Sequence, residues 1–269
     1  MKLYFYILII LAAVLTTSCK DDVIINNDKL VVIIKADDYS DYSPNWQHFF
    51  SMLKKNDISA GAGVITALTE SNYQSIVKIR ELSQLKRTDG KPLIEFWNHG
   101  YDHAGIDGKS HEFCNTNIYI QELHFMLSQK FFSDSLRFIS RTFSAPFNRT
   151  NSITIHALAS YPEIHTIMRY HSHEKYSIKR PWVDPNKKKV KAGDKVCLNI
   201  TFQKVYNLPL NDVINYFNTD KKESYLVIQI HPLTWKEDDF TDFQKMIDFL
   251  KAKNVVFMTP EEYYEYLKR

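Results

Sequence analysis

The sequence predicts an α/β protein in which parallel strands form a (β/α) barrel, complete or incomplete, with helices outside. Apolar runs rich in β-branched residues alternate with segments of helical period from about residue 30 to the end of the chain. About seven or eight such units in roughly 240 residues suit a barrel better than an open sheet. Chemically reactive side chains also gather where the predicted strands end, which is where both architectures place their sites.

Each predicted element has a local reason in the sequence. The strands are short apolar runs bounded by polar residues, glycine or proline. They cover Leu30–Ala36, Ile58–Leu68, Pro92–Trp97, Arg137–Ala145, Ile164–Tyr170, Val196–Phe202, Ser224–Ile230 and Val255–Met258. The helices repeat apolar residues every three or four positions, and two of them have proline in the first turn. They cover Pro44–Lys55, Asn72–Leu85, Thr116–Phe132, Ser152–Ser160, Asn211–Phe217, Phe240–Lys253 and a last helix from Pro260.

One segment interrupts this alternation. Lys179–Lys195 contains two prolines, a glycine and three successive lysines, which indicate a solvated loop. The alternative is that its lysines form the rim of a site for an anionic glycan.

The composition is that of a globular protein and argues against two kinds of partner. Of the 269 residues, 44% are hydrophobic and 24% are charged, so the chain can bury a substantial core. A net charge of only +3 gives no reason to expect binding to nucleic acid or attraction to an acidic membrane surface. No segment after the N-terminus is long and apolar enough to span a bilayer.

The N-terminus has the pattern of a targeting segment. Residues 1–18 hold a short basic start, an apolar run and then small residues, which is typical of a secretory signal peptide. Cys19, directly after these small residues, resembles the lipidated cysteine of a bacterial lipobox. A plain cleaved signal or a membrane anchor is the alternative.

The residues after Cys19 predict where the protein is anchored. Residues 19–29 are polar and indicate a tether, and Lys20-Asp21-Asp22 resembles the signal that sends some Gram-negative lipoproteins to the cell surface. We therefore expect lipid anchoring to the outer membrane, with residues 30–269 as the folded domain. Cys114 and Cys197 could pair in such an oxidising compartment, which the sequence leaves open.

Three predicted strands end in residues that bind metals or move protons. Asp37 and Asp38 follow the first strand, His99 and His103 follow the third, and His231 follows a late one. One carboxylate and two imidazoles make an open metal site that leaves positions for water and substrate. The second aspartate can then act as a general base, and the late histidine can protonate a leaving group. The set predicts metal-assisted hydrolysis of an amide or ester.

These motifs, in this order, resemble those of the polysaccharide deacetylase superfamily, the NodB-like deacetylases related to carbohydrate esterase family 4. The matching stretches are Asp37-Asp38, Phe96 to His103, Phe143 to Asn148 and His231 to Trp235. The resemblance covers about residues 30 to 265. It implies the family's distorted (β/α)7 barrel and makes residues 30–269 a catalytic domain.

The resemblance also implies a role for each reactive residue. Asp38, His99 and His103 would be the ligands of a metal ion, usually zinc. Asp37 would be the general base and His231 the general acid.

Contacts to the substrate follow from the same motifs. The backbone N–H of Phe147, next to Pro146, would help to hold the oxyanion. Trp97 and Trp235 are expected to contact the sugar, although both rings could equally belong to the core.

The chain departs from the family at the base. An arginine usually stands two residues before the motif proline and braces the base aspartate, whereas this chain has Ser144 there. Arg141 should face the opposite side of its strand, and Arg149 or Arg169 could replace the missing side chain. The first motif also lacks the customary phenylalanine and glycine around its aspartates.

The sequence thus favours a surface-anchored, metal-dependent hydrolase that removes acetyl groups, N-acetyl foremost, from a carbohydrate or polysaccharide. An O-acetyl esterase is the alternative within enzymes. A catalytically weak glycan-binding lipoprotein, with Trp97, Trp235 and Tyr101 as its platform, is the alternative outside them. His171 and His173 form the one rival pair of metal ligands.

Overall fold

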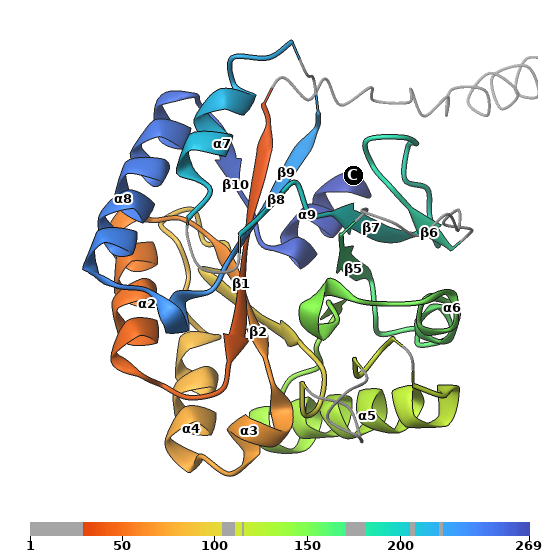
Figure 1. Ribbon diagram of the computed structural model, residues 1–269. Helices are drawn as coiled ribbons and strands as arrows, with labels where there is room; N and C mark the ends of the chain where they lie inside the picture. The colour runs from red at the N-terminus through yellow and green to blue at the C-terminus, as the bar shows by residue number, and fades with distance from the viewer. Residues whose placement is uncertain (1–28, 104–110, 115, 171–180, 205–207, 221–222) are drawn as a thin grey trace, which may run out of the picture.

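The computed structural model describes residues 29–103, 111–114, 116–170, 181–204, 208–220 and 223–269 (Figure 1). The strands are β1 (Val31–Tyr39), β2 (Ala60–Val64), β3 (Ile94–Asn98), β4 (Thr142–Phe143), β5 (Thr166–Arg169), β6 (Trp182–Val183), β7 (Lys195–Asn199), β8 (Phe202–Gln203), β9 (Tyr225–Ile230) and β10 (Val256–Phe257). The helices are α2 (Pro44–Asn56), α3 (Thr66–Glu70), α4 (Tyr73–Leu82), α5 (Ile118–Phe131), α6 (Ser152–Ala159), α7 (Leu210–Tyr216), α8 (Glu237–Ala252) and α9 (Pro260–Leu267). Short turns of other helix types are η1 (Phe132–Leu136), η2 (Pro146–Asn148) and η3 (Pro232–Thr234).

All strand pairs in the described chain are parallel, in the order β6-β7-β5-β4-β3-β2-β1-β9-β8, and β10 pairs with the start of β1. β7 and β8 lie toward opposite ends of this order, yet only Ile200 and Thr201 separate them in the chain. The Ile200 N–H donates to Arg169 of β5, and the Thr201 N–H donates to Val227 of β9. One extended segment therefore bonds to both sides of the sheet and closes it. Strands β1 to β5, the joined β7–β8 and β9 form the predicted distorted (β/α)7 barrel.

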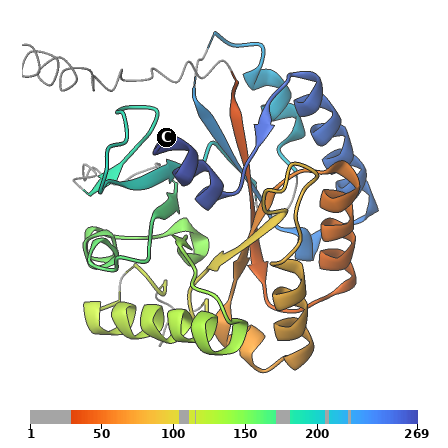
Figure 2. The same ribbon diagram turned by 180° about the vertical axis from the view of Figure 1, so that it is seen from behind.

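Strand β1 shows how the sequence divides the barrel into an inside and an outside. Val32 and Ile34 pack in the core between the sheet and the outer helices, whereas Val31 and Ile33 pack inside the barrel. Because side chains alternate along a strand, Lys35 and Asp37 continue the inward row. Helices α2, α4, α7 and α8 cover one side of the molecule, and α5 and α6 lie around the other, in both views (Figures 1 and 2).

Three predicted elements need correction. The strand predicted at Ile58–Leu68 ends at Val64, and the residues after it form helix α3. The extended run predicted at Arg137–Ala145 forms a strand only at Thr142–Phe143, and Arg137 instead ends the π-helix η1 in a left-handed conformation. The expected loop Lys179–Lys195 contains the buried strand β6, which pairs with β7.

The other expectations about membranes and cysteines fall partly outside the described residues. Residues 1–28, and with them Cys19 and most of the tether, lie outside that range, as do His171 and His173. No helix within the described part of the chain has the length and apolar character needed to cross a bilayer. Cys114 and Cys197, which could have paired, are not joined by a disulfide.

Candidate active site

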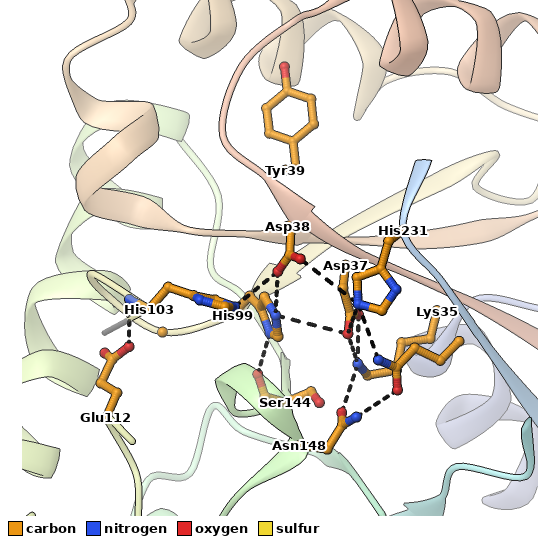
Figure 3. A network of polar contacts seen from close by, with 12 residues as sticks. Lys35, Asp37, Asp38, Tyr39, His99, His103, Glu112, Ser144, Asn148 and His231 are labelled. Atoms are coloured by element: carbon orange, nitrogen blue, oxygen red, sulfur yellow. Dashed lines mark hydrogen bonds and ion pairs between the residues drawn. The ribbon is translucent and has the colours of Figure 1, made fainter. Parts of the chain in front are cut away.

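The two aspartates reach the site from a bulge at the carboxyl end of β1. The pairing of β1 with β2 shifts register between Ala36 and Tyr39, and Asp38 has a φ of 68°. Aspartate tolerates this left-handed conformation better than most residues do, and bulges commonly redirect side chains beside active sites. The consequence is that Asp37 and Asp38, although adjacent, both face the same site (Figure 3).

Asp38 lies between two histidines from the end of β3. Its Oδ1 is 3.2 Å from His99 Nε2 and 3.1 Å from His103 Nε2, and these three ligand atoms lie within 4.8 Å of one another. Burial acts to raise the pKa of Asp38, but hydrogen bonds to the two histidines hold it far below its usual range. His99 Nδ1 lies 2.7 Å from the Ser144 carbonyl oxygen and donates to it, which leaves Nε2 as the nitrogen that faces Asp38.

A buried glutamate fixes the turn that carries the two histidines. Glu112, fully buried, accepts hydrogen bonds from the N–H groups of Tyr101 at 2.6 Å and His103 at 3.0 Å. Its Oε1 also lies 3.1 Å from His124 Nδ1, and this hydrogen bond raises the pKa of His124. Gly100 passes so close to Glu112 that a Cβ there would lie 2.6 Å from Oε2, and its φ of +85° also favours glycine.

Glu112→Gln should weaken metal binding at the histidine turn. An amide keeps the size of the side chain but offers only one acceptor oxygen for the two N–H groups, so the turn loses a hydrogen bond. Loss of such supporting contacts typically costs 10–100-fold in metal affinity. Zinc titration with a competing chelator measures this, and Glu70→Gln, an exposed glutamate on α3, is the control. Unchanged affinity in Glu112→Gln would show that the turn holds its shape without the carboxylate.

Asp37 and His231 lie on the other side of Asp38. Asp37 is 2% exposed, and its Oδ2 lies 3.9 Å from His231 Nε2 and 3.9 Å from His99 Nε2. His231, at the end of β9, is also 3.8 Å from Asp38 Oδ2. The predicted base and the predicted acid therefore lie close to one another, on one side of the three candidate ligands (Figure 3).

Pro146 and Phe147 form the edge of the site through the turn η2. Phe147 has a φ of 57°, and its side chain is 51% exposed. Its ring packs 4.5 Å from the ring of His103 and 4.8 Å from that of His111. Its N–H lies in the first turn of η2, where N–H groups lack a partner within the turn. The oxyanion contact expected of the Phe147 N–H stays a prediction.

The expectation that Trp97 and Trp235 contact the substrate is wrong. Trp97 has no exposed surface and fills the barrel against β2, where a Cβ on Gly63 would come within 2.7 Å of ring atom Cζ2. Trp235, 6% exposed, packs against Phe49, Phe240 and Phe243. Both rings belong to the core, Trp97 inside the barrel and Trp235 between the sheet and helices α2 and α8.

The residue that braces Asp37 is Lys35, which the sequence reasoning did not consider. Its Nζ lies 2.6 Å from Asp37 Oδ1 and closer still to Oδ2. Arg141 faces away as expected, with its Nε 3.8 Å from Glu261 at the other end of the barrel. Arg149, proposed as a replacement, is exposed. A lysine inside a buried strand, two residues before an active-site aspartate, is a signal that could have been found from sequence.

A cavity of about 450 Å³ is separate from this site. It opens near the start of β3 and α9, at the amino ends of the strands, and is lined by residues such as Ile94, Glu95 and Glu261. The reactive residues predicted from the motifs all lie at the opposite, carboxyl edge. Fold and site together define a class of protein: a distorted (β/α)7 barrel with an Asp-His-His cluster beside a carboxylate and a third imidazole.

Solved structures of this class identify the fold more closely, although no family model and no curated protein matches the sequence. The chain is similar to a family 4 acetyl xylan esterase from Clostridium thermocellum in complex with a cobalt ion, with 12% identity over 88% of this chain and 91% of that one and a TM-score of 0.55. It is also similar to the peptidoglycan deacetylase PdaC from Bacillus subtilis, with 12% identity over 90% and 93% and a TM-score of 0.53. The chain thus has the fold of the carbohydrate esterase family 4 deacetylases, as the motifs implied.

A third similar structure is described as a pseudoenzyme. It is a carbohydrate esterase family 4 protein from Bacillus anthracis, with 11% identity over 88% of this chain and 66% of that one and a TM-score of 0.54. A mutant of it is described as having restored activity. The fold therefore occurs with and without activity, and the side chains of the site must decide between them.

Proposed function

We propose that this protein is a metal-dependent hydrolase that removes acetyl groups, N-acetyl groups foremost, from a carbohydrate or polysaccharide. The observation that carries this proposal is the convergence of five side chains at one edge of the barrel. Asp38, His99 and His103 form the candidate metal site, with Asp37 and His231 beside them. Such a set of ligands with a base and an acid is what amide or ester hydrolysis requires.

The donor atoms suit a divalent metal ion, for which zinc is our proposal. Two imidazole nitrogens and one carboxylate oxygen are the donors that zinc takes in catalytic sites, with open positions left for water and substrate. The fixed tautomer of His99, with its Nδ1–H on the Ser144 carbonyl, presents the correct nitrogen. When bound, the metal would acidify a water molecule and polarise the acetyl carbonyl.

The chain's own residues would move the protons and hold the charge. Asp37, paired with the Lys35 ammonium, would accept a proton from the attacking water. His231 would donate a proton to the departing nitrogen or oxygen of the sugar. The N–H of Phe147 would donate a hydrogen bond to the oxyanion, a contact typically worth ~3 kcal/mol.

The alternative of a glycan-binding protein has lost its main support. That alternative used Trp97, Trp235 and Tyr101 as its platform, and both tryptophan rings are buried, while Tyr101 is half-buried. Phe147 has an exposed ring, which packs against His103. A sugar that contacts this ring would therefore lie next to the candidate metal site. An O-acetyl esterase remains the alternative within enzymes, since similar structures include both an acetyl xylan esterase and a peptidoglycan deacetylase.

Acetate release from a panel of acetylated glycans tests the proposal. Zinc-loaded protein would be incubated with chitooligosaccharides, peptidoglycan and acetylated xylan, and free acetate would be measured. We expect release from the N-acetylated substrates. Release from xylan alone would establish the esterase, and no release from any substrate by fully metallated protein would refute the proposed function.

We also propose that the protein is lipid-anchored at the outer membrane through Cys19. The support is the cysteine directly after the small residues of the signal and the Lys20-Asp21-Asp22 sequence behind it. Cys19→Ala is expected to abolish incorporation of labelled fatty acid and to release the protein from the membrane fraction, because the lipid is the anchor. Equal labelling of the variant and the natural protein would refute the anchor.

A further inference from the structure

Lys35 is a cation placed inside the barrel. It continues the inward row of Val31 and Ile33, has no exposed surface, and lies with its Nζ 5.2 Å from the centre of the Trp97 ring. Burial lowers the pKa of Lys35, and the Asp37 carboxylate opposes that effect. Apolar residues can often replace a buried ion pair without loss of stability. A charged pair at this position therefore calls for a reason other than the stability of the core.

Lys35 makes its hydrogen bonds to the predicted general base and to Asn148 beside it. Both described hydrogen bonds to the Asp37 carboxylate come from the Lys35 ammonium, which also donates to Asn148 Oδ1 at 3.1 Å. The ammonium thus holds the base from beneath, on the side away from the metal ligands (Figure 3). Two hydrogen bonds from one charged donor fix the position of a carboxylate.

A directed chain of hydrogen bonds continues from Lys35 to the predicted acid. Because Asn148 accepts from the ammonium through Oδ1, its Nδ2 is the donor to Gln229 Oε1, at 2.7 Å. Gln229 then presents its Nε2 to His231 Nε2, 3.4 Å away. The base and the acid are therefore the two ends of one buried polar path through three side chains.

The position that holds the bracing arginine in the polysaccharide deacetylase family is occupied here by a serine with a different role. Ser144 replaces the family's arginine, and its short side chain brings no positive charge. Its carbonyl oxygen instead accepts the hydrogen bond from His99 Nδ1. The cation beside the base comes from β1, two residues before Asp37, rather than from the loop after β4.

We propose that Lys35 is the positioning residue of the general base: its two hydrogen bonds hold the Asp37 carboxylate aligned, in place of the absent arginine. The inference rests on the proposed function, because it assigns Lys35 a task in that reaction. It predicts that Lys35 acts on turnover through Asp37 and leaves the metal ligands alone, since its described hydrogen bonds go to Asp37 and Asn148.

A double-mutant cycle on kcat tests this assignment. Lys35→Met is expected to lower kcat by roughly 10²-fold, within the range for positioned proton transfer, with KM and metal content unchanged. If Lys35 acts through Asp37, then Lys35→Met/Asp37→Asn should be no slower than Asp37→Asn alone. Thr166→Val, a buried and nearly isosteric change on β5, is the control and should leave kcat unchanged.

A double variant slower by the product of the two single effects would overturn the proposal, because Lys35 would then act independently of Asp37. Lys35→Met alone leaves a buried carboxylate unpaired and can fail to fold. In that event the double variant, which removes both charges, should fold, and its failure where Asp37→Asn folds would also overturn the assignment. An inactive natural protein refutes the proposed function before any variant is made, and the role of Lys35 falls with it.

Discussion

His99→Ala and His103→Ala are each expected to lose tight metal binding and, with it, acetate release. Each change removes one of three donor atoms that lie within 4.8 Å of one another, and water is a poorer ligand for zinc than imidazole. We expect the affinity to fall by more than ~10²-fold, since even supporting contacts are worth 10–100-fold. Metal content after dialysis, with one ion per chain in the natural protein, is the measurement.

A histidine away from the site provides the control. His156 is exposed on α6, and His156→Ala should retain the metal and the activity. Full metal content in the His99→Ala/His103→Ala double variant would contradict the assignment of these ligands.

Asp37→Asn and His231→Ala should keep the metal and lose turnover. These residues lie beside the metal ligands and would serve only to move protons, so their loss leaves the three donor atoms in place. Positioned proton transfer contributes typically 10²–10⁴-fold, and kcat should fall by about that factor with little change in KM. Steady-state acetate release at saturating zinc measures the effect.

Asp38→Asn separates the two neighbouring aspartates. An amide oxygen is a poorer ligand for zinc than a carboxylate, so this variant should lose metal affinity, whereas Asp37→Asn should not. The reverse pattern would mean that the bulge in β1 presents the wrong aspartate to the metal. Equal metal loss in both variants would mean that the two carboxylates share the ion.

The fold could be predicted largely because its signals are local. Alternation of apolar strands and amphipathic helices indicates a barrel. Along β1, side chains at alternate positions face into the barrel or out toward the helices. The closure of the barrel could not be predicted in this way. It depends on the backbone hydrogen bonds of Ile200 to β5 and of Thr201 to β9. These bonds join residues that are distant along the chain, so no local pattern predicts them.

The site could be predicted in part for a similar reason. Asp37, Asp38, His99, His103 and His231 stand directly at strand ends, where the architecture gathers reactive groups. Their supports are less visible in a sequence, because each contact joins residues distant along the chain.

Three residues illustrate this limit. Glu112 supports the histidine turn from a separate segment, and nothing in its own surroundings marks it. Trp97 was expected at the surface because it stands in a motif, yet a tryptophan beside two glycines of the next strand fills space in the barrel. Lys35 did carry a signal: it stands two residues before Asp37 in the same strand, so both side chains are expected on the same face of the sheet.

A titration of acetate release with zinc tests the central claim most directly. Protein stripped with a chelator would be given increasing zinc and assayed on an N-acetylated glycan, beside Asp37→Asn treated in the same way. We predict that release rises from near zero, saturates at one zinc per chain, and remains far lower in Asp37→Asn at the same metal content. Natural protein that binds one zinc and releases acetate no faster than Asp37→Asn, or that is equally active without metal, would contradict the account.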